Sequence, residues 1–530
     1  MESQYAEFIL NRVDEEAVVT TLMRELDQRA EENPSVIACR IGNRSQTFGE
    51  LAQQVRLFAA ALLELGLEPG DRVSLYLPNS VEYVTCWYGA MRAGMVANPI
   101  NAALSPREVE FLLDDSGAQV LVTTANLAGK LGEILSERTE LRLIVADADI
   151  SASGLTLADL LTGGERDVPY PPGDAAACLP YSSGTTGRPK GVVHSHDSLS
   201  AQAVLSANAL QLRTGDILVH ALPLVHLFAG NIVMGGLLVA GATMVVQPSF
   251  DPSGFVDLLA ETRATACAGV PANYAMLTRL PDDNVRLGPT DALQVAFSAG
   301  APLPTAIREG FRARFGAPVL NCYGITEAGG NLAASLRYGE TPDLSCGIVY
   351  PRTELRIVDS DDNPVPAGEV GELVARGPQI MTGYWRRPSA TAQALRGGWF
   401  HTGDLARFDA DGYLYIVDRR NDLIVSGGYN VYPAEVEDVL QEHPGVESCA
   451  VFGIEDSVKG EKPWAAVVPA NAAVDVESLE SFCRERLAAY KVPRRFVVVD
   501  EIPRNSLGKL QRGVLRKRYS PESSSSTSTS

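Results

Sequence analysis

The sequence predicts an α/β fold: a large N-terminal domain of parallel α/β sheets with a small β-barrel-like unit, then a small α+β C-terminal domain. Strand and helix patterns alternate along the first part of the chain, which is typical of parallel sheets with covering helices. From residue 347 to 417, short alternating strands with Gly and Asp turns indicate an antiparallel unit. The chain has 530 residues, which is more than one core normally organises, so we expect two or more domains.

Each element follows from hydrophobic periodicity and from the turn residues that bound it. In the first part, apolar residues at helical spacing predict helices at 48–65 and 81–93. Buried apolar runs predict strands at 72–77, 118–123, 175–179, 217–220, 242–247, 264–268, 294–298 and 318–321. In the C-terminal segment we expect helices at 434–441 and 476–490, and strands at 447–452, 465–469 and 495–499.

Composition excludes several classes of protein. The formal net charge is −20, which argues against a nucleic-acid partner, because phosphate backbones require clustered Lys and Arg. The eight cysteines include no Cys-x-x-Cys pair, which favours free thiols in a reducing compartment. The N-terminus is acidic and polar, and no apolar run is long enough to span a bilayer. We therefore expect a cytoplasmic protein without a membrane span, with a disordered Ser/Thr tail at 521–530.

The most informative segment is the loop at 181–191, Tyr-Ser-Ser-Gly-Thr-Thr-Gly-Arg-Pro-Lys-Gly. Its glycines allow the backbone to approach an anion closely, and Lys190 adds a charge suited to a phosphate. The spacing differs from the P-loop of nucleoside triphosphatases, and the alternative is an ordinary Gly/Ser surface loop. The residues expected to contact phosphate are Ser182, Ser183, Gly184, Thr185, Thr186 and Lys190.

A second candidate segment is Tyr323-Gly-Ile-Thr-Glu327, which is expected to follow a strand. Tyr323 can stack on a planar base, Thr326 can bond a phosphate, and Glu327 can hold Mg²⁺. The alternative is a strand-to-helix turn in which Thr326 is the N-cap.

Three shorter segments are ambiguous on their own. The small residues of Ser298-Ala-Gly-Ala-Pro302 suit a flat ligand lying against the backbone. Asp404 can accept the hydroxyls of a ribose, with Arg419 beside it, although a Gly-Asp pair is also a plain turn. Lys509 lies beside a glycine, and from spacing alone it reads as a solvated surface lysine.

Together these segments resemble the ANL superfamily of adenylate-forming enzymes, which includes acyl-CoA synthetases, carrier-protein adenylation domains and beetle luciferases. The resemblance covers residues 25–518, with the motifs in the family's order. Within the superfamily, 382–388 and 427–433 look most like fatty-acyl-CoA and aryl-CoA ligases. The motifs are 181–191, 298–302, 323–327, 402–404, 418–422, 426–428 and 503–509.

The resemblance implies an adenylation domain at 1–418 and a mobile domain at 419–520, with the hinge at Asn421. It also moves Lys509 into the active site, so that the catalytic set is Lys509, Glu327, Thr186 and Lys190, with Glu327 and Thr186 at the metal. The implied ATP and AMP contacts outside the phosphate loop are Gly300, Ala301, Asn321, Cys322, Tyr323, Gly324, Thr326, Asp404, Arg419 and Lys509. The implied acyl pocket is His226, Phe228, Asn231 and Ile232, and the implied CoA contacts are Ser426, Gly427, Gly428 and Tyr429.

The activity implied is ATP- and Mg²⁺-dependent conversion of a carboxylic acid to its acyl-AMP, followed by transfer to CoA, by a monomer or homodimer. A hinge rotation lets one active site serve both steps. The alternatives are transfer to an acyl-carrier protein, activation of another small oxyanion, a luciferase-like oxygenase and a silent binding protein. Intact Lys509, Glu327 and Thr186 argue against the last of these.

Several positions depart from the relatives. Asn421 stands where relatives have a hinge Asp or Lys. Ser249 and Gly427 replace basic residues near CoA, which leaves the thiol acceptor more open than the adenylation step. Phe228 and Ile232 make the acyl wall apolar and suited to a fatty or unhydroxylated aryl acid.

Overall fold

The structure is a computed structural model. It describes residues 21–520 except 148–154, 165, 183–188, 282–291, 338–340, 420–421, 427–428, 457–459, 471–473 and 505–509. The chain divides into two compact units. The first contains the chain up to Glu354 together with Ala375–Phe400, and the second contains Leu355–Val374 together with the chain from His401 onward.

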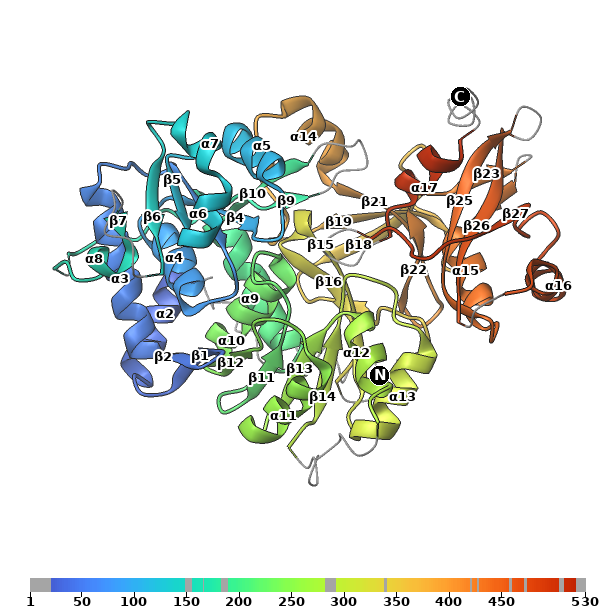
Figure 1. The fold of residues 1–530 in the computed structure, drawn as a ribbon, viewed down its shortest axis with the longest axis horizontal. Coiled ribbons are helices and arrows are strands. Elements are labelled where there is room, and N and C mark those ends of the chain that lie inside the picture. Colours follow the sequence, from blue (N-terminus) through green and yellow to red (C-terminus); the bar gives the residue numbers. More distant parts are fainter. Residues whose placement is uncertain are drawn as a thin grey trace. The chain divides into compact units, whose positions relative to one another are not determined.

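The first unit contains two nine-stranded sheets (Figure 1). In the first sheet the pairs from β1 to β15 are parallel, and antiparallel strands close both ends. Its order is β17 (Ile348–Val349), β16 (Gly330–Ala334), β15 (Val319–Ile325), β14 (Val295–Ser298), β13 (Ala266–Gly269), β11 (Ile217–His220), β12 (Thr243–Val246), β1 (Ile37–Ile41) and β2 (Arg44–Thr47).

The second sheet is parallel from β7 to β8, and β10 then pairs antiparallel with three strands. Its order is β20 (Gly383–Tyr384), β10 (Lys190–Ser195), β8 (Ala176–Cys178), β4 (Val96–Asn101), β3 (Arg72–Leu77), β5 (Val120–Thr123), β6 (Arg142–Val145) and β7 (Leu155–Thr156), with β9 (Tyr181–Ser182) beside β10. The predicted parallel α/β fold of this part of the chain is confirmed.

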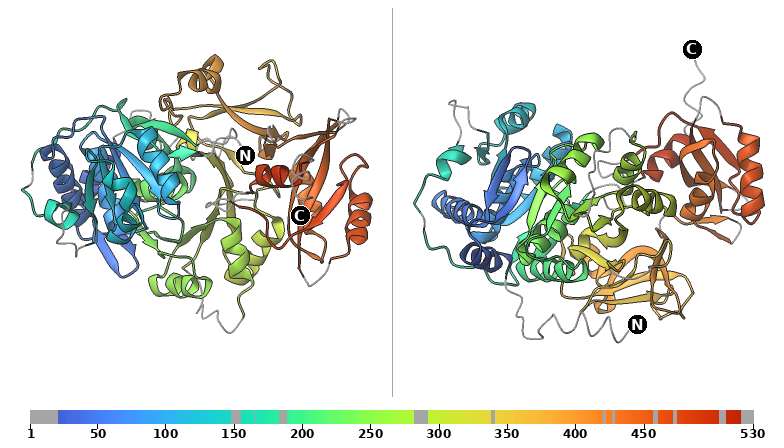
Figure 2. Two further views of the ribbon diagram at one scale, coloured as in Figure 1. Left: turned by 45° about the horizontal axis from the view of Figure 1, so that its top comes forward. Right: turned by 90° about the horizontal axis from the view of Figure 1, so that it is seen from below.

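Helices α4 and α9 contact strands of both sheets, and the two sheets lie beside one another in both views of Figure 2. This position explains why nearly every residue of α4 is buried, since a helix packed between two sheets has no solvent-facing side. A capping box between Thr47 and Glu50 begins α3. The helices are α2 (Leu22–Glu32), α3 (Phe48–Glu64), α4 (Val81–Arg92), α5 (Pro106–Ser116), α6 (Ala125–Lys130), α7 (Gly132–Ser136), α8 (Leu157–Leu160), α9 (His196–Ala209), α10 (Met234–Ala240), α11 (Pro252–Thr262), α12 (Pro271–Thr278), α13 (Thr305–Phe315) and α14 (Pro388–Ala394).

The second unit begins with a four-stranded sheet in the order β18 (Glu354–Val358), β19 (Gly371–Arg376), β21 (Phe400–Phe408) and β22 (Leu414–Arg419). A five-stranded sheet follows, in the order β24 (Tyr429–Val431), β23 (Ile424–Ser426), β26 (Gly460–Pro469) and β25 (Val446–Asp456), with β27 (Arg495–Val498) beside β26. Its helices are α15 (Pro433–Gln441), α16 (Val476–Arg486) and α17 (Arg512–Tyr519).

Successive residues of β25 are buried on opposite faces of the five-stranded sheet. Cys449 and Val451 belong to the core cluster that includes residues of α15 and α16. Ala450 and Phe452 belong to a separate cluster with Leu515 of α17. Because successive strand residues point to opposite faces, α17 covers the face that α15 and α16 leave open.

Several predicted element boundaries are wrong. β25 continues to Asp456 instead of ending at 452, and β26 begins at Gly460 instead of 465. The strand expected to end at 321 continues as β15 to Ile325, because its second half pairs antiparallel with β16. Tyr323 and Gly324 therefore lie within a strand and not after it. The helix expected to reach 490 ends at Arg486.

Two negative findings concern the described residues alone. None of their helices combines the length and the apolar character needed to cross a bilayer. The eight cysteines are all buried and none forms a disulfide. The predicted tail at 521–530 lies outside the described residues.

Candidate active site

The two ends of the glycine-rich loop are joined by a short antiparallel ladder. Ser182 of β9 lies opposite Lys190 of β10 in this ladder. The expected phosphate contacts Ser183, Gly184, Thr185 and Thr186 lie outside the described residues. The ladder thus brings both ends of the loop to one edge of the second sheet.

Glu327 accepts hydrogen bonds from two hydroxyl groups at this edge. Ser182 Oγ donates to Glu327 Oε1 at 2.9 Å, and the Tyr384 hydroxyl donates to the same oxygen at 3.1 Å. Burial, together with the charge of Glu327, raises the pKa of Tyr384, so its hydroxyl stays protonated and acts as a donor. Lys190 Nζ lies 5.0 Å from the centre of the Tyr384 ring. A carboxylate, two hydroxyls and an ammonium group are therefore gathered beside the loop.

Two hydrogen bonds to backbone carbonyls hold the Glu327 turn in this position. Glu327 lies in the 3₁₀ turn Thr326–Ala328, and its carbonyl accepts from the N–H of Met381 at 2.8 Å. His194 Nε2 lies 2.8 Å from the Thr326 carbonyl. Burial lowers the pKa of His194 to about 4, so the ring is neutral at pH 7 and donates from Nε2. The alternative in which Thr326 is an N-cap is wrong, because Thr326 is the first residue of the 3₁₀ turn and the cap position is Ile325.

The expected nucleotide contacts of this region lie on, or just after, two neighbouring parallel strands. Ser298 at the end of β14 pairs with Asn321 of β15, and Gly300 follows with a φ of 87°. Such a left-handed conformation favours glycine. Asn321 is buried, and its amide donates to the Ser345 carbonyl at 3.1 Å. Ala301 follows Gly300 and is half-buried.

Three residues of β15 that are expected to contact the nucleotide are enclosed by the strand's neighbours. Tyr323 is only 9% exposed, and Cys322 is buried, which raises the pKa of its thiol. At Gly324 a Cβ atom would lie 2.2 Å from the carbonyl oxygen of Gly330, so the β15–β16 ladder requires glycine there. The expected stacking face of Tyr323 is thus largely covered in this structure.

The expected acyl-pocket residues lie in and beside a π-helical turn, η1 (Phe228–Val233). The Asn231 amide donates to the Gly329 carbonyl at 3.1 Å, and a Cβ added to Gly330 would lie 2.4 Å from Ile232 Cδ1. His226 Nε2 lies 3.5 Å from the Asn101 amide nitrogen, and Phe228 is half-buried. Asn231 and Ile232 therefore contact the two residues that follow the Glu327 turn.

Asp404 and Arg419 form a pair within the second unit. They lie opposite one another in the β21–β22 ladder, and Arg419 Nε lies 2.6 Å from Asp404 Oδ1. The Asp404 carboxylate is only 2% exposed, which a charged group tolerates when it is paired. Ser426 is buried in β23. The other predicted residues outside the described part are Asn421, Gly427, Gly428, Lys509 and the side chain of Tyr429.

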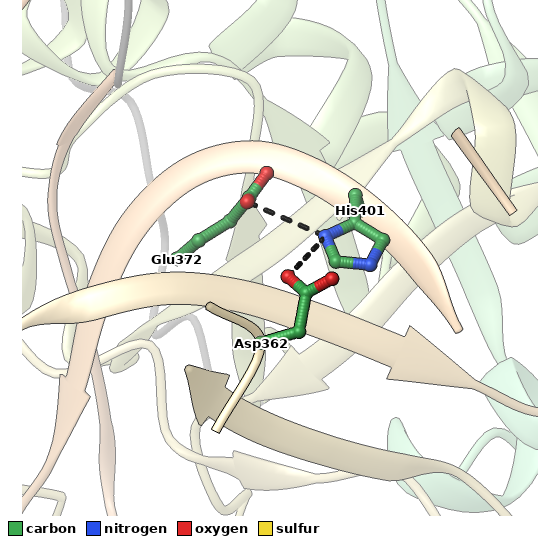
Figure 3. Close-up of side chains that lie close together, drawn as sticks. All are labelled: Asp362, Glu372 and His401. Atoms are coloured by element: carbon green, nitrogen blue, oxygen red, sulfur yellow. Dashed lines mark hydrogen bonds and ion pairs between the residues drawn. The ribbon is translucent and has the colours of Figure 1, made fainter. Parts of the chain in front are cut away.

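His401 lies between two carboxylates at the start of the strand that carries Asp404 (Figure 3). Its Nδ1 is 3.3 Å from Glu372 Oε2 and 3.9 Å from Asp362 Oδ1. One ligand atom of each residue lies within 4.8 Å of the others, a spacing that one cation can bridge. The imidazole already pairs with Glu372, however, and Thr402 Oγ1 donates to the Leu373 carbonyl at 2.7 Å. These contacts attach β21 to β19.

The structure identifies two residues that motif reasoning did not assign to the site. Tyr384 lies in the 382–388 stretch that contributes to the resemblance, and its hydroxyl contacts Glu327 directly. His194 orients the peptide before Glu327. Its only sequence signal is its position at the end of the strand that leaves the phosphate loop, where the chain reads Gly-Val-Val-His.

The chain matches the AMP-binding enzyme family over residues 26–385, and the C-terminal domain of AMP-binding enzymes over residues 435–509. It is 36% identical to a feruloyl-CoA synthase of Amycolatopsis sp, over 93% of this chain and 98% of that one. It is 35% identical to a long-chain-fatty-acid–CoA ligase of Escherichia coli, over 89% of each chain.

Among solved structures, the fold is similar to that of an anthranilate CoA ligase, AuaEII, in complex with anthranoyl-AMP. The TM-score is 0.88 at 28% identity, and the alignment covers 95% of this chain and 98% of the other. The anthranoyl-AMP is bound in the structure of that ligase.

Proposed function

The chain belongs to the AMP-binding enzyme family, and on this premise we propose that it is an ATP-dependent acid–thiol ligase. It converts a fatty or aryl carboxylic acid to its acyl-AMP, releases pyrophosphate, and transfers the acyl group to CoA. The observation that carries the proposal is the convergence on Glu327 of Ser182, from the phosphate-loop end, and Tyr384. Ile232 of the expected acyl wall lies against Gly330, which follows Glu327 by three residues.

The first step joins two anions, since a carboxylate oxygen attacks the α-phosphorus of ATP and the bond to pyrophosphate breaks. Catalysis therefore depends on positioning and on neutralising charge. We assign Lys190 and the hydroxyls of the 182–186 loop to the phosphates. Thr186 is assigned with Glu327 to the metal.

The oxygen donors around Glu327 suit Mg²⁺, which binds proteins through one or two carboxylates and completes its shell with phosphate and water. A bound metal would supply positive charge that offsets the negative charge of the phosphates. Ser182 and Tyr384 fix the carboxylate that would hold it by hydrogen bonds to one oxygen, Oε1.

The second step is attack of the CoA thiolate on the acyl carbon, with AMP as the leaving group. We propose that Lys509 serves only the first step, and that a rotation at Asn421 then presents Ser426–Tyr429 for the second. The boundary between the two moving parts is placed after residue 418. Asp404 and Arg419 are assigned to the ribose, and Gly300 to Ala301 and Asn321 to Thr326 to the remaining nucleotide contacts.

The proposal is tested by measuring pyrophosphate release across a panel of acids, with and without CoA. The expected result is acid-dependent release without CoA, with thioester appearing only when CoA is added. Absence of acid-dependent release with every fatty and aryl acid would contradict the proposal.

One prediction concerns the choice of acid. Phe228 and Ile232 leave a phenolic hydroxyl without a partner, and the Asn231 amide already donates to backbone carbonyls. We therefore expect hydroxycinnamates such as ferulate to lose about 1–3 kcal/mol relative to matched unhydroxylated acids, roughly 5- to 150-fold in kcat/KM. Steady-state kinetics with cinnamate, coumarate, ferulate and medium-chain fatty acids measures this. The feruloyl-CoA synthase relative makes ferulate the critical competitor, and a higher kcat/KM for ferulate than for cinnamate would refute the prediction.

A second prediction concerns the thiol acceptor. Ser249 is exposed and stands where relatives carry a basic residue near CoA. Restoring the charge with Ser249→Arg adds an exposed contact of about 0.3–1 kcal/mol, so the KM for CoA is expected to fall roughly two- to five-fold at low salt. Adenylate formation stays unchanged, because the substitution affects ground-state binding of CoA alone. The matched control is Ser136→Arg, at the exposed end of α7.

Ser249 and Gly427 stand where the resemblance places basic residues near CoA. Their lack of charge favours one alternative, transfer to an acyl-carrier protein, because such an acceptor needs no site for the CoA nucleotide. Thioester formation with free CoA is compared with that on phosphopantetheinylated carrier proteins. Efficient adenylation without thioester at saturating CoA would assign the carrier protein as the acceptor.

A further inference from the structure

Arg512 is a buried cation three residues beyond Lys509, at the start of α17. Its side chain is 11% exposed and makes four polar contacts. Nη2 donates to Glu437 Oε2 at 2.6 Å and Nε to Glu437 Oε1 at 3.2 Å. Nε also donates to the Val451 carbonyl at 3.0 Å, and Nη1 to Asp422 Oδ2 at 3.1 Å. One guanidinium thus joins α17 to α15, to β25 and to the segment just after residues 420–421.

Glu437 is fixed as firmly as its partner. Its Oε1 also accepts from the Val451 N–H at 2.6 Å, and its side chain is 11% exposed. The Arg512–Glu437 pair is bidentate, a geometry that lysine cannot reproduce. Removing either charge would leave the other buried and uncompensated.

The described residues on either side of 505–509 belong to the same body as Arg512. Arg504 and Leu510 form an antiparallel bridge, and the Gln511 N–H donates to the Pro503 carbonyl at 2.9 Å. Ile502 and Leu515 lie in one core cluster with Phe452 of β25. The chain that leads into and out of 505–509 is therefore attached to β25.

Among the described residues, the four hydrogen bonds of Arg512 all lie on the C-terminal side of Asn421, although the charge of Asp418, on the other side, also raises the pKa of Arg512. Asp422, Glu437 and Val451 would consequently move together with α17 in a rotation at Asn421. By contrast, Asp418 accepts from the Ala434 N–H at 3.0 Å, and such a rotation would break that bond. Arg512 links the first residues beyond the proposed hinge to the segment that carries Lys509.

We propose that Arg512 is a positioning residue for the adenylation step, which acts by holding α17, the residues on either side of 505–509, and the hinge-side residue Asp422 in one rigid body. This inference rests on the proposed function, because it assigns Lys509 to adenylation alone. Because the Arg512 side chain is only 11% exposed and its hydrogen bonds are to protein groups, we assign it a positioning role and no substrate contact. Its loss displaces a group that must be placed within about 1 Å.

The test is Arg512→Lys, assayed in the two half-reactions separately. Adenylation is followed by acid-dependent pyrophosphate release, and thioester formation by the conversion of supplied acyl-AMP with CoA. We expect kcat for adenylation to fall roughly 10- to 100-fold, with the KM for ATP changed less than threefold and thioester formation within about threefold of wild type. The matched control is Arg484→Lys on α16, where an exposed arginine pairs with Glu480, and it is expected to leave both half-reactions unchanged.

Two outcomes would overturn the inference: equal loss in both half-reactions, or no loss in either. If Arg512→Lys fails to fold, Glu437→Gln removes the charge of the partner while keeping an acceptor, and it should show the same selectivity at smaller size. Equal losses with that variant also overturn the inference. Lys509→Ala is measured in parallel, so that failure of the proposed function can be distinguished from failure of this inference. If Lys509→Ala slows both half-reactions equally, the proposal that Lys509 serves adenylation alone is wrong. If Lys509→Ala slows only adenylation but Arg512→Lys slows both half-reactions equally, only the role of Arg512 is refuted.

Discussion

Lys509→Ala is expected to reduce adenylate formation by about 10²–10³-fold while leaving the conversion of supplied acyl-AMP to acyl-CoA nearly unchanged. The physical reason is that a lysine charge near the reacting phosphate is needed only while negative charge builds up on the departing pyrophosphate. The thiol step involves no pyrophosphate, so the same charge contributes nothing to it. The measurement is single-turnover acyl-AMP formation, compared with thioester formation from purified acyl-AMP.

The matched control is Lys517→Ala on α17, which removes an exposed lysine from the same C-terminal segment. It should leave both half-reactions at wild-type rates. If Lys509→Ala slows both steps to the same extent, the lysine is not confined to adenylation and the proposed alternation between two arrangements is wrong.

The second large effect is expected at Glu327. Glu327→Gln keeps the shape and the acceptor for Ser182 and Tyr384, but removes the negative charge. We expect adenylate formation at fixed Mg²⁺ to fall on the order of 10²-fold, with partial recovery as Mg²⁺ is raised. Pyrophosphate release is measured as a function of Mg²⁺ concentration, and Mg·ATP binding by calorimetry provides a readout independent of turnover.

Glu309→Gln provides the control for charge, because Glu309 is an exposed carboxylate on α13. Its Mg²⁺ dependence should match that of wild type. An unchanged Mg²⁺ dependence in Glu327→Gln, with activity retained, would remove Glu327 from the metal site and leave only its hydrogen bonds to Ser182 and Tyr384 as its role.

Local sequence determined much of the fold. The strands at Arg72–Leu77 and Ile217–His220 have the predicted limits, because each is a short apolar run bounded by turn residues. The glycine-rich loop could be predicted as a phosphate site because the chemistry of phosphate binding is local: glycines, hydroxyls and a lysine within eleven residues. The limits of β15 were not predictable in this way, since its last residues are strand only through their pairing with β16.

The candidate site itself depended on contacts between distant parts of the chain. Ser182 and Glu327 are 145 residues apart, Tyr384 and Glu327 are 57 apart, and Asn231 and Gly329 are 98 apart. No periodicity reports such pairs, because they arise from the order in which strands join a sheet and from the antiparallel placement of β20 against β10. The sequence by itself predicted which residues bind phosphate and determined where most strands and helices form. Tertiary structure alone decided that Tyr384 reaches Glu327, that His194 holds the peptide before it, and that Arg512 joins α17 to Asp422, since each of these depends on bringing distant side chains within hydrogen-bonding distance.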